Sequence, residues 1–509
     1  MNNVTNFKKT CIALAVAQAW SIGQVHAATM RVTIGTEDEL NGCTFRNAVA
    51  AINSGANTNC SNVSSNGFGT NDAIEFDVTN ISLEDGQITI ESSNVDPTKH
   101  VDVKINPNGD RVTIFRSSSN NFRIFQINDS TVSFDNVSIK NGRTTNGGSA
   151  GSGAGIFSNN ATVVLSNSEV SGNSSSYYGG GVFNSSNGSL SLTSSSVSGN
   201  TSSNQGGGVF NSGNISLTTS TVSDNTSSTS GGGIYNAYGA TTTLANSTVL
   251  GNSANTGTGR GGGILNSAST ITTLNNSTVS GNSANIGGGF YNVASTTTLN
   301  NSTVLGNSAS YVGGGIYNAY GDTILTNSTV SGNTAANSGG GIYNLYGDTT
   351  ITNSTVSGNT AANSGGGFAS TSAFITITNT MIIGNTAAIA SESVDTSIIT
   401  ASNSVFGNSI SGFDPIANPA DNNIVVDLSS TNLDTVLLPL TNNGGPTLTH
   451  ALPESSPAID AGDNANCPAT DQRGEARDLQ CDIGAYERLD DTNFFVVPLA
   501  NGKAVIFGL

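Results

Sequence analysis

The chain has 509 residues, of which 62 are glycine, and only 10% of the residues are charged. Acidic residues outnumber basic ones by 34 to 16, and the formal net charge of −18 makes nucleic acids and anionic membranes unfavourable partners. Hydrophobic residues make up 35% of the chain, below the usual ~45–50%, yet they recur at fixed intervals, which argues against low-complexity disorder.

Residues 1–27 have the pattern of a bacterial secretory signal peptide. Lys8 and Lys9 precede an apolar run from Cys11 to Trp20, and residues 25–27 (Val-His-Ala) form a small-x-small cleavage site. The apolar run is shorter than the ~20 residues that a membrane-spanning helix needs, so a retained anchor is the weaker alternative. We therefore expect a mature chain without a transmembrane span, located outside the cell or on the outer surface of a bacterium.

Residues 28–145 are expected to form an N-terminal cap and the first coils of a repeat structure. Apolar side chains at helical spacing, Phe45, Ala48, Val49 and Ile52, predict a short amphipathic helix. We expect this helix to plug the first coil, because the open end of a stacked structure exposes its core and its unpaired strand edges.

From about Thr162 to Ala388 the sequence repeats itself with a period that settles at 26 residues. The later units read Asn-Ser-Thr-Val-Ser-Gly-Asn, then a variable segment, then Gly-Gly-Gly-Ile-Tyr-Asn and a second variable segment. One column is apolar, and each member has a leucine or isoleucine five residues before it: Val170, Val197, Val222, Val249, Val279, Val304, Val330, Val356 and Ile382. An asparagine follows three residues later without exception: Asn173, Asn200, Asn225, Asn252, Asn282, Asn307, Asn333, Asn359 and Asn385.

These repeats predict the fold class. Short apolar runs that are rich in β-branched residues and interrupted by glycine and asparagine favour strands over helices. A single unit of short strands cannot bury its apolar side, whereas units stacked at a spacing of ~4.8 Å can. We therefore predict an all-β protein, a right-handed parallel β-helix over residues 146–410 with a cap at each end.

Stacking places like residues above one another, which predicts a role for each column. The valine and leucine columns become inward stacks, and a threonine column beside the valines faces outward: Thr221, Thr248, Thr278, Thr303, Thr329 and Thr355. The asparagine column becomes a ladder at a turn, because side-chain amides bond along the stack and asparagine tolerates the left-handed backbone of a sharp turn. The glycine triplets supply positive φ and a close approach of neighbouring strands.

The two large residues after each glycine triplet suggest a binding surface. Neighbours in a strand point to opposite faces, so one of the two columns should be external: Phe183, Phe210, Tyr235, Leu265, Tyr291, Tyr317 and Tyr343. An exposed aromatic stripe can stack on sugar rings or anchor a protein, so the candidate ligand-binding residues are Tyr235, Tyr291, Tyr317 and Tyr343. The alternative is that a bend at the triplet places both columns inside.

The charged residues of the repeats offer little for catalysis. Between Gly151 and Thr400 there is no lysine or histidine, whereas a lyase needs a strong base with cationic or metal help. Asp322 and Asp348 lie one period apart, each in a Tyr-Gly-Asp-Thr segment, and stacking would bring them ~5 Å apart. This pair is the best candidate for a Ca²⁺ site or for glycosidase carboxylates, although two loop acids facing solvent is the favoured interpretation.

Four segments near the C-terminus closely resemble the choice-of-anchor Q domain, which would then occupy residues 411–488. They are Leu438–Thr447 (LPLTNNGGPT), Ser456–Gly462 (SPAIDAG), Asp471–Gly474 (DQRG) and Asp482–Glu487 (DIGAYE). The Gly-Gly-[Ile/Val]-[Tyr/Phe]-Asn repeats resemble those of polymorphic outer-membrane proteins. Residues 43–49 resemble a degenerate CSLREA motif that departs from the pattern at Thr44, Phe45 and Asn47. These resemblances imply a secreted or surface-displayed bacterial β-helix protein, and they supply no catalytic residues.

Two further features concern the chain ends. The dense charged group of the C-terminal cap is expected to form an internal ion-pair network: Asp471, Arg473, Arg477, Asp482 and Glu487. Residues 489–509 read as a tail hairpin, two short strands joined by an Asn-Gly turn.

Four cysteines remain once Cys11 leaves with the signal peptide, and they form two local pairs. A long β-helix keeps its ends far apart, so we predict the disulfides Cys43–Cys60 and Cys467–Cys481. Metal ligation is the weaker interpretation, because no histidine accompanies either pair.

Together these observations predict a secreted or surface-displayed, non-catalytic β-helix protein without a cofactor that acts as an adhesin or binds glycans. Its expected partner is a polysaccharide or a surface protein of a host or neighbouring cell. Two alternatives stay open: a polysaccharide-active lyase or glycosidase, and a structural envelope protein that self-associates.

Overall fold

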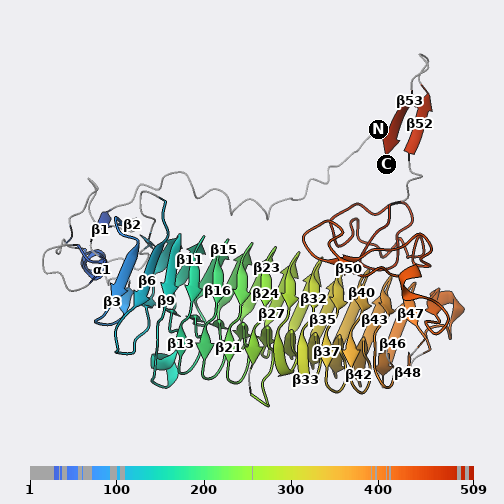
Figure 1. Cartoon of the computed structure of the whole chain (residues 1–509), viewed down its shortest axis with the longest axis horizontal. Helices are drawn as coiled ribbons and strands as arrows, with labels where there is room; N and C mark the ends of the chain where they lie inside the picture. The colour runs from blue at the N-terminus through green and yellow to red at the C-terminus, as the bar shows by residue number, and fades with distance from the viewer. Residues whose placement is uncertain are drawn as a thin grey trace, which may run out of the picture.

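The structure is a computed structural model, and it describes most of the chain after the predicted signal peptide. The described residues are 28–33, 35–36, 43–55, 60, 71–91, 100–103, 109–254, 256–390, 393–395, 398–408, 410–411, 414–489, 494–498 and 504–508. They form the predicted right-handed parallel β-helix, built from two sheets of 14 strands, one of 13 and one of 8 (Figure 1). The predicted signal peptide at residues 1–27 lies outside the described residues. Within the described ranges, no helix has the length and apolar character to cross a membrane.

One coil shows how the repeat becomes structure. It runs through β34 (Ile316–Ala319), β35 (Asp322–Thr326), β36 (Thr329–Ser331) and β37 (Thr334–Ala335). We name the sheets that contain these strands C, A, B and D, in that order. Each strand pairs in parallel with its equivalent one coil away, so that like residues face each other along the whole solenoid.

The predicted inward columns form the core. Ile316, Leu325 and Val330 in this coil are all 0% exposed, and their equivalents in the other coils belong to the same hydrophobic cluster. The glycine triplet lets neighbouring coils approach closely, because a Cβ atom on Gly314 would overlap the carbonyl oxygens of Thr334 and Gly340. The period of the sequence is therefore the period of the coil.

The asparagine ladder is present, and its geometry corrects one expectation. Every link joins the Nδ2 of one asparagine to the Oδ1 of the next at 2.9 Å, as between Asn307 and Asn333. The left-handed backbone was expected at the asparagine, but it is adopted by the residue before it, for example Gly306 with φ of 60° and Gly332 with φ of 64°. The glycine makes the turn, which leaves the asparagine side chain free to point inward and bond along the stack.

A second buried ladder was not predicted from the sequence. The asparagine that ends each Gly-Gly-Gly-Ile-Tyr-Asn segment is 0% exposed, and along most of the column its amide bonds to the next one, as from Asn292 to Asn318 at 2.7 Å and from Asn318 to Asn344 at 2.9 Å. Asn266 is an exception, since its amide donates to Thr297 at 2.9 Å. The signal is present in the sequence, because an asparagine stands at this position after every glycine triplet except the last, where Ser370 takes its place.

The N-terminal end is covered by helix α1 (Phe45–Ser54). The Oγ1 of Thr44 accepts a hydrogen bond from the backbone N–H of Asn47, and the helix ends at Gly55 in the left-handed conformation. The predicted apolar face is buried against β1 (Thr29–Val32), β2 (Asn71–Phe76) and β4 (Ile88–Glu91). The predicted disulfide between Cys43 and Cys60 is present beside the start of the helix.

Residues 427–489, which we call the C-terminal lobe, lie along the side of the solenoid over its last coils (Figure 1). The lobe packs on the outer face of sheet B, over β32 (Thr303–Leu305), β36, β40 (Thr355–Ser357) and β44 (Met381–Ile383). It contains the predicted disulfide Cys467–Cys481.

The predicted charged group lies inside this lobe. Arg473 pairs with Asp471 at 2.7 Å and Arg477 pairs with Glu487 at 2.6 Å, and both carboxylates are fully buried.

The chain ends in the expected hairpin. Strand β52 (Phe494–Pro498) pairs antiparallel with β53 (Ala504–Gly508). The predicted Asn-Gly turn, residues 501–502, lies outside the described residues.

Candidate functional site

The aromatic column after the glycine triplets lies on the outer face of sheet C. In β34 the side chain of Ile316 is inside the core at 0% exposure, and Tyr317 points to the other side of the sheet, outside the main core. The column is nevertheless largely covered, since Tyr317 is only 8% exposed and Tyr235, Tyr291 and Tyr343 are half-buried. The bend that would have placed both columns inside does not occur.

The rings of this column stack on one another. Tyr291 and Tyr317 lie 4.9 Å apart between ring centroids, Tyr317 and Tyr343 lie 5.6 Å apart, and the planes are within 7° of parallel. Tyr235 belongs to a separate stack with Phe210, beyond the gap left by Leu265. Neighbouring rings cover most of the faces, so this column presents ring edges and hydroxyl groups to solvent, and it is a poor platform for a sugar ring.

Burial also changes the pKa of a tyrosine in this column. Desolvation, with the neighbouring Tyr291 and Tyr343, raises the pKa of Tyr317 to about 12. A phenol with so high a pKa stays protonated at physiological pH and does not act as a base. The column is therefore an apolar ridge with hydroxyl tips.

This ridge is widest over three consecutive coils. Strands β30 (Phe290–Val293), β34 and β38 (Ile342–Leu345) each have four residues, whereas the earlier β22 (Ile234–Asn236) has three. The extra position adds a column that packs beside the tyrosines: Val293, Ala319 and Leu345. The three predicted tyrosines of these coils thus belong to a small hydrophobic cluster outside the main core.

Two further tyrosines, which sequence reasoning missed, stand at the corner between sheets C and A. Tyr320 is 62% exposed and Tyr346 is 50% exposed, and their rings stack at 5.2 Å with an angle of 22°. Both adopt the left-handed backbone, with φ of 56° and 57°. The signal in the sequence is the tyrosine of each Tyr-Gly-Asp-Thr segment, from which only the aspartate was predicted as a site residue.

The backbone of these tyrosines is unusual. A bulky residue at positive φ is an outlier, and the left-handed conformation costs roughly 1–2 kcal/mol for a residue other than glycine. Equivalent turns of other coils carry Asn160, Ser269, Ala294 or Ser372 at this position. Folding alone would favour such smaller residues, so the tyrosines are held at the corner against the local backbone preference.

The two predicted aspartates lie beside this tyrosine pair. Asp322 begins β35 and Asp348 begins β39 (Asp348–Thr352), and the two residues are direct register partners. Both are exposed, and neither carboxylate has a hydrogen-bond or ion-pair partner among the residues that the structure describes. Two exposed apolar side chains lie in the same column. Phe374, at 61% exposure, is the register partner of Asp348, and Ile271, at 52%, lies beyond Thr296 on the side of Asp322.

The structure brings the two aspartates together as predicted, but it adds no third ligand for a metal. Within the described part of the chain, no three histidine, cysteine or acidic side chains are grouped so as to hold a metal ion. A Ca²⁺ ion takes 6–8 oxygen ligands as a rule, roughly twice what two carboxylates offer.

A hollow of about 220 Å³ opens where the tyrosine pair ends. The coils before Tyr320 carry small residues at the corner, and the hollow is lined by Ser269, Thr270, Ile271, Ala294, Ser295, Thr296, Tyr320, Gly321 and Asp322. One face of Tyr320 stacks on Tyr346, and Tyr320 also lines this hollow. Thr270 is 1% exposed, and its hydroxyl has no hydrogen-bond partner among the described residues.

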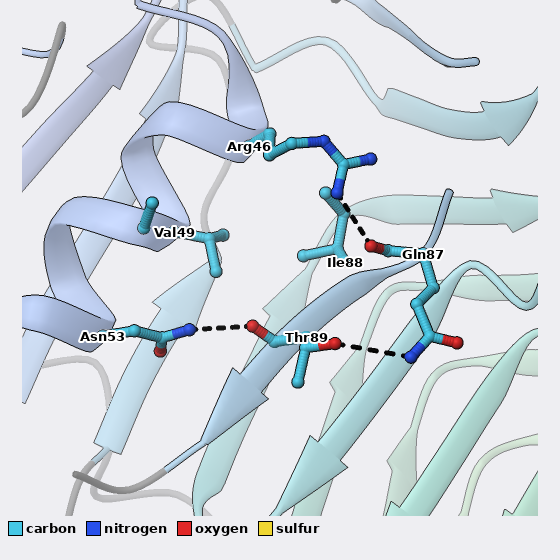
Figure 2. Close-up of a pocket in the computed structure, with 7 residues that line it drawn as sticks. Arg46, Val49, Asn53, Gln87, Ile88 and Thr89 are labelled. Carbon is cyan, nitrogen blue, oxygen red and sulfur yellow. Dashed lines mark hydrogen bonds between the residues drawn. The ribbon is translucent and has the colours of Figure 1, made fainter. Parts of the chain in front are cut away.

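A second hollow, of about 170 Å³, lies between α1 and β4 at the N-terminal end (Figure 2). Its polar groups are already used to hold the helix. Arg46 donates to the carbonyl of Gln87 at 2.9 Å, and the Nδ2 of Asn53 donates to the carbonyl of Thr89 at 2.8 Å (Figure 2). These hydrogen bonds therefore hold the cap helix against the solenoid, and the hollow lies within that contact.

The electrostatics of the corner favour neutral or positively charged ligands. Between Arg143 and Arg473 the sequence holds a single lysine or arginine, Arg260. Its guanidinium lies 5.4 Å from the ring centroid of Tyr291, on the outer face of sheet C. With two unpaired carboxylates at the corner, a polyanion would meet repulsion there.

Comparisons with known proteins add little beyond the fold. No protein-family model matches the chain, and no curated protein matches it. The structure is similar to the crystal structure of pectate lyase Pel9A with a TM-score of 0.39 and 14% sequence identity, over 91% of this chain and 97% of that chain. A likeness this weak does not bear on activity, and the sequence resemblances to the choice-of-anchor Q, CSLREA and polymorphic outer-membrane families remain predictions.

Proposed function

We propose that the protein is exported and binds glycan chains, without cleaving them, at the corner formed by Tyr320, Tyr346, Asp322 and Asp348. The observation that carries the proposal is the exposed tyrosine pair, whose outer ring borders a hollow lined by hydroxyl-bearing side chains. An open ring face beside polar groups is the arrangement that stacks on one side of a sugar and hydrogen-bonds its edge. The hollow is smaller than the ~300–1,000 Å³ typical of drug-sized sites, and it suits one ring of a longer chain.

The absence of cleavage is argued from the two aspartates. A glycosidase sets its carboxyl groups on either side of the scissile bond in different environments, so that one is protonated while the other is ionised. Asp322 and Asp348 occupy the same position of successive repeats, and both are exposed. Equivalent environments do not separate an acid from a base, which favours binding over hydrolysis.

Export is proposed from the sequence pattern of residues 1–27. N-terminal sequencing of protein recovered from the medium or cell surface tests it, and a mature chain that begins at Ala28 is expected. Recovery of a chain that still begins at Met1 would contradict this part of the proposal.

Binding is tested by retention on a panel of neutral, acidic and amino polysaccharides, with simultaneous assay for new reducing or unsaturated ends. We expect retention without new ends, and at least a tenfold loss of affinity in Tyr346→Ser. The control is Tyr311→Ser, because Tyr311 has the same 50% exposure but lies on β33 (Ser308–Val312) in sheet D.

Each other outcome has a distinct meaning. New chain ends would make the protein an enzyme. Equal losses in both tyrosine variants would show that the corner is not the site, and concentration-dependent assembly without glycan binding would favour a structural envelope protein.

A further inference from the structure

The glycan-binding corner has a feature that a neutral sugar does not use. We infer that the sugar bound beside Tyr320 carries a protonated amine, so that the ligand is an amino sugar with a free ammonium group. The inference rests on the proposed glycan binding and narrows the class of glycan.

The two carboxylates of the corner repel each other. Asp322 and Asp348 are register partners on neighbouring strands, so their Cα atoms lie at the strand spacing of ~4.8 Å. Like charges directly opposite each other in a sheet are destabilising, and neither carboxylate has a partner among the described residues. A cation placed between them would relieve this repulsion.

An aromatic side chain lies in the same hollow. Tyr320 and Asp322 both line it, so a ligand in the hollow would meet the tyrosine and the carboxylate together. An ammonium group is attracted to the face of an aromatic ring, and the attraction grows when the ring and the cation are shielded from water. Phe374, the register partner of Asp348, supplies apolar cover on one side of the pair, and Thr296 is the register neighbour of Asp322 on the other side.

Hydroxyl groups also line the hollow. Thr270 offers a buried hydroxyl without a partner among the described residues, and Ser269 and Thr296 also line the hollow. A buried hydroxyl without a partner is costly, and the hydroxyls of a sugar ring would satisfy it. A simple cation such as a lysine side chain satisfies the carboxylates but leaves this hydroxyl unused.

A neutral or acidic sugar fits the same place less well. A neutral ring can donate hydroxyl hydrogen bonds to Asp322, but it brings no positive charge to offset the repulsion between the two carboxylates, and a uronic acid would add a third negative charge. Arg260 is the single lysine or arginine between Arg143 and Arg473, and it lies near Tyr291 instead.

The test compares one oligosaccharide in two forms, a β-1,4-linked glucosamine hexamer and its fully N-acetylated counterpart, by titration calorimetry at pH 5.5 with the full mature chain. We expect the free-amine form to bind at least tenfold more tightly at low salt, with the difference shrinking as salt is added. The variant Asp322→Asn/Asp348→Asn should lose this preference, so that the two forms bind with equal affinity. Asp434→Asn removes one exposed acid from the C-terminal lobe and should leave the preference unchanged.

The outcomes separate this inference from the proposed function. Equal affinity for both hexamers would overturn the inference and leave glycan binding in place. A preference for the amine that survives in Asp322→Asn/Asp348→Asn would also overturn it, because net charge and not the pair would then be responsible. Failure of both hexamers and of every glycan on the panel would overturn the proposed function itself.

Discussion

Two stretches of sheet B carry the same outward threonine column, but only one of them is covered by the C-terminal lobe. In β20 (Thr221–Ser223), β24 (Thr248–Leu250) and β28 (Thr278–Ser280) the threonines are half-buried and no other part of the described chain docks on them. In β32, β36 and β40 the equivalent threonines are 0–2% exposed under the C-terminal lobe. The repeat itself does not distinguish the two stretches.

What differs is the residues that break the repeat in the last coils. Met381 and Ile383 point outward from β44, and Val405 points outward from β47 (Val405–Gly407), where earlier coils carry threonine or serine at most equivalent positions. These apolar side chains form a second core with the lobe, together with Leu437 and Ile483. The repeat builds a uniform platform, and departures from it decide what binds where.

The largest effect is expected when the apolar side chains under the lobe are replaced. Met381→Ser/Ile383→Ser should detach the lobe, because polar substitution of buried apolar side chains costs roughly 2–5 kcal/mol each. Limited proteolysis with trypsin is the measurement, since Arg473 and Arg477 have side chains only 9% and 3% exposed in the docked lobe. We expect rapid cleavage at both arginines.

The matched control lies in the open stretch. Leu250 occupies the position of Ile383 in an earlier coil and is 42% exposed, so Leu250→Ser should leave cleavage unchanged. Protection of Arg473 and Arg477 in the Met381→Ser/Ile383→Ser variant would show that polar contacts alone hold the lobe.

A smaller effect is expected from the threonines themselves. Thr329 donates to the Oε1 of Gln472 at 2.6 Å, and Gln472 is fully buried, so Thr329→Val should destabilise the docked lobe by about 1–3 kcal/mol. The same change in the open stretch, Thr248→Val, should be close to neutral, because valine is favoured in strands and no buried partner is lost. Denaturant unfolding compares the two, and equal effects would mean that the lobe does not use the threonine column.

The two stretches should also differ in pH dependence. Burial and the neighbouring Glu487 raise the pKa of Asp482 in the lobe to about 7, from an ordinary value of 3.8. The folded lobe then binds more protons than the unfolded one between these values, so this contribution is complete below pH 3.8 and is lost as the pH rises towards 7. The slope cannot exceed about 1.4 kcal/mol per pH unit for one group.

Thermal unfolding of the lobe, followed by scanning calorimetry from pH 4 to pH 8, checks this expectation. Asp482→Asn should flatten the profile, although it perturbs the two backbone N–H groups, of Asp460 and Arg488, that Asp482 accepts from. A lobe that becomes more stable as the pH rises would contradict the predicted sign.

The smallest expected change in stability belongs to the corner tyrosine. Tyr320→Asn should leave the free energy of unfolding unchanged or raise it by up to ~1 kcal/mol, because asparagine tolerates the left-handed backbone better than tyrosine. Glycan binding should nevertheless be lost. Calorimetry for both quantities separates a binding defect from a folding defect, and a clearly destabilised variant would show that Tyr320 is there for the fold.

Translational symmetry explains how much the sequence could predict. A column such as Val330 or Asn333 is repeated so often that its inward position and its bonding along the axis follow from the period alone. The cap helix and both disulfides were predictable for a different, local reason: the helix from the spacing of its apolar side chains and the disulfides from two pairs of nearby cysteines.

Periodicity does not predict features that occur once or twice and have no local signature in the sequence. Met381 and Ile383 look like ordinary core residues in the sequence, and the outward direction becomes apparent only when the strand is placed. Tyr320 escaped notice because its position is set by the backbone of a turn, which the local sequence preference opposes. Side-chain docking over long sequence separations, as between Thr329 and Gln472, leaves no periodic signal.

The asparagine ladder gives the solenoid an adjustable length. Its links keep one geometry, 2.9 Å from Nδ2 to Oδ1, while the number of residues between successive rungs varies from 25 to 30. A lineage can therefore gain or lose a whole coil in one duplication or deletion, because each end of the insert meets the same rung. Tyr320 and Tyr346 sit one such unit apart, so copying a coil would extend the binding corner by a complete tyrosine and aspartate, and binding strength could evolve in whole steps.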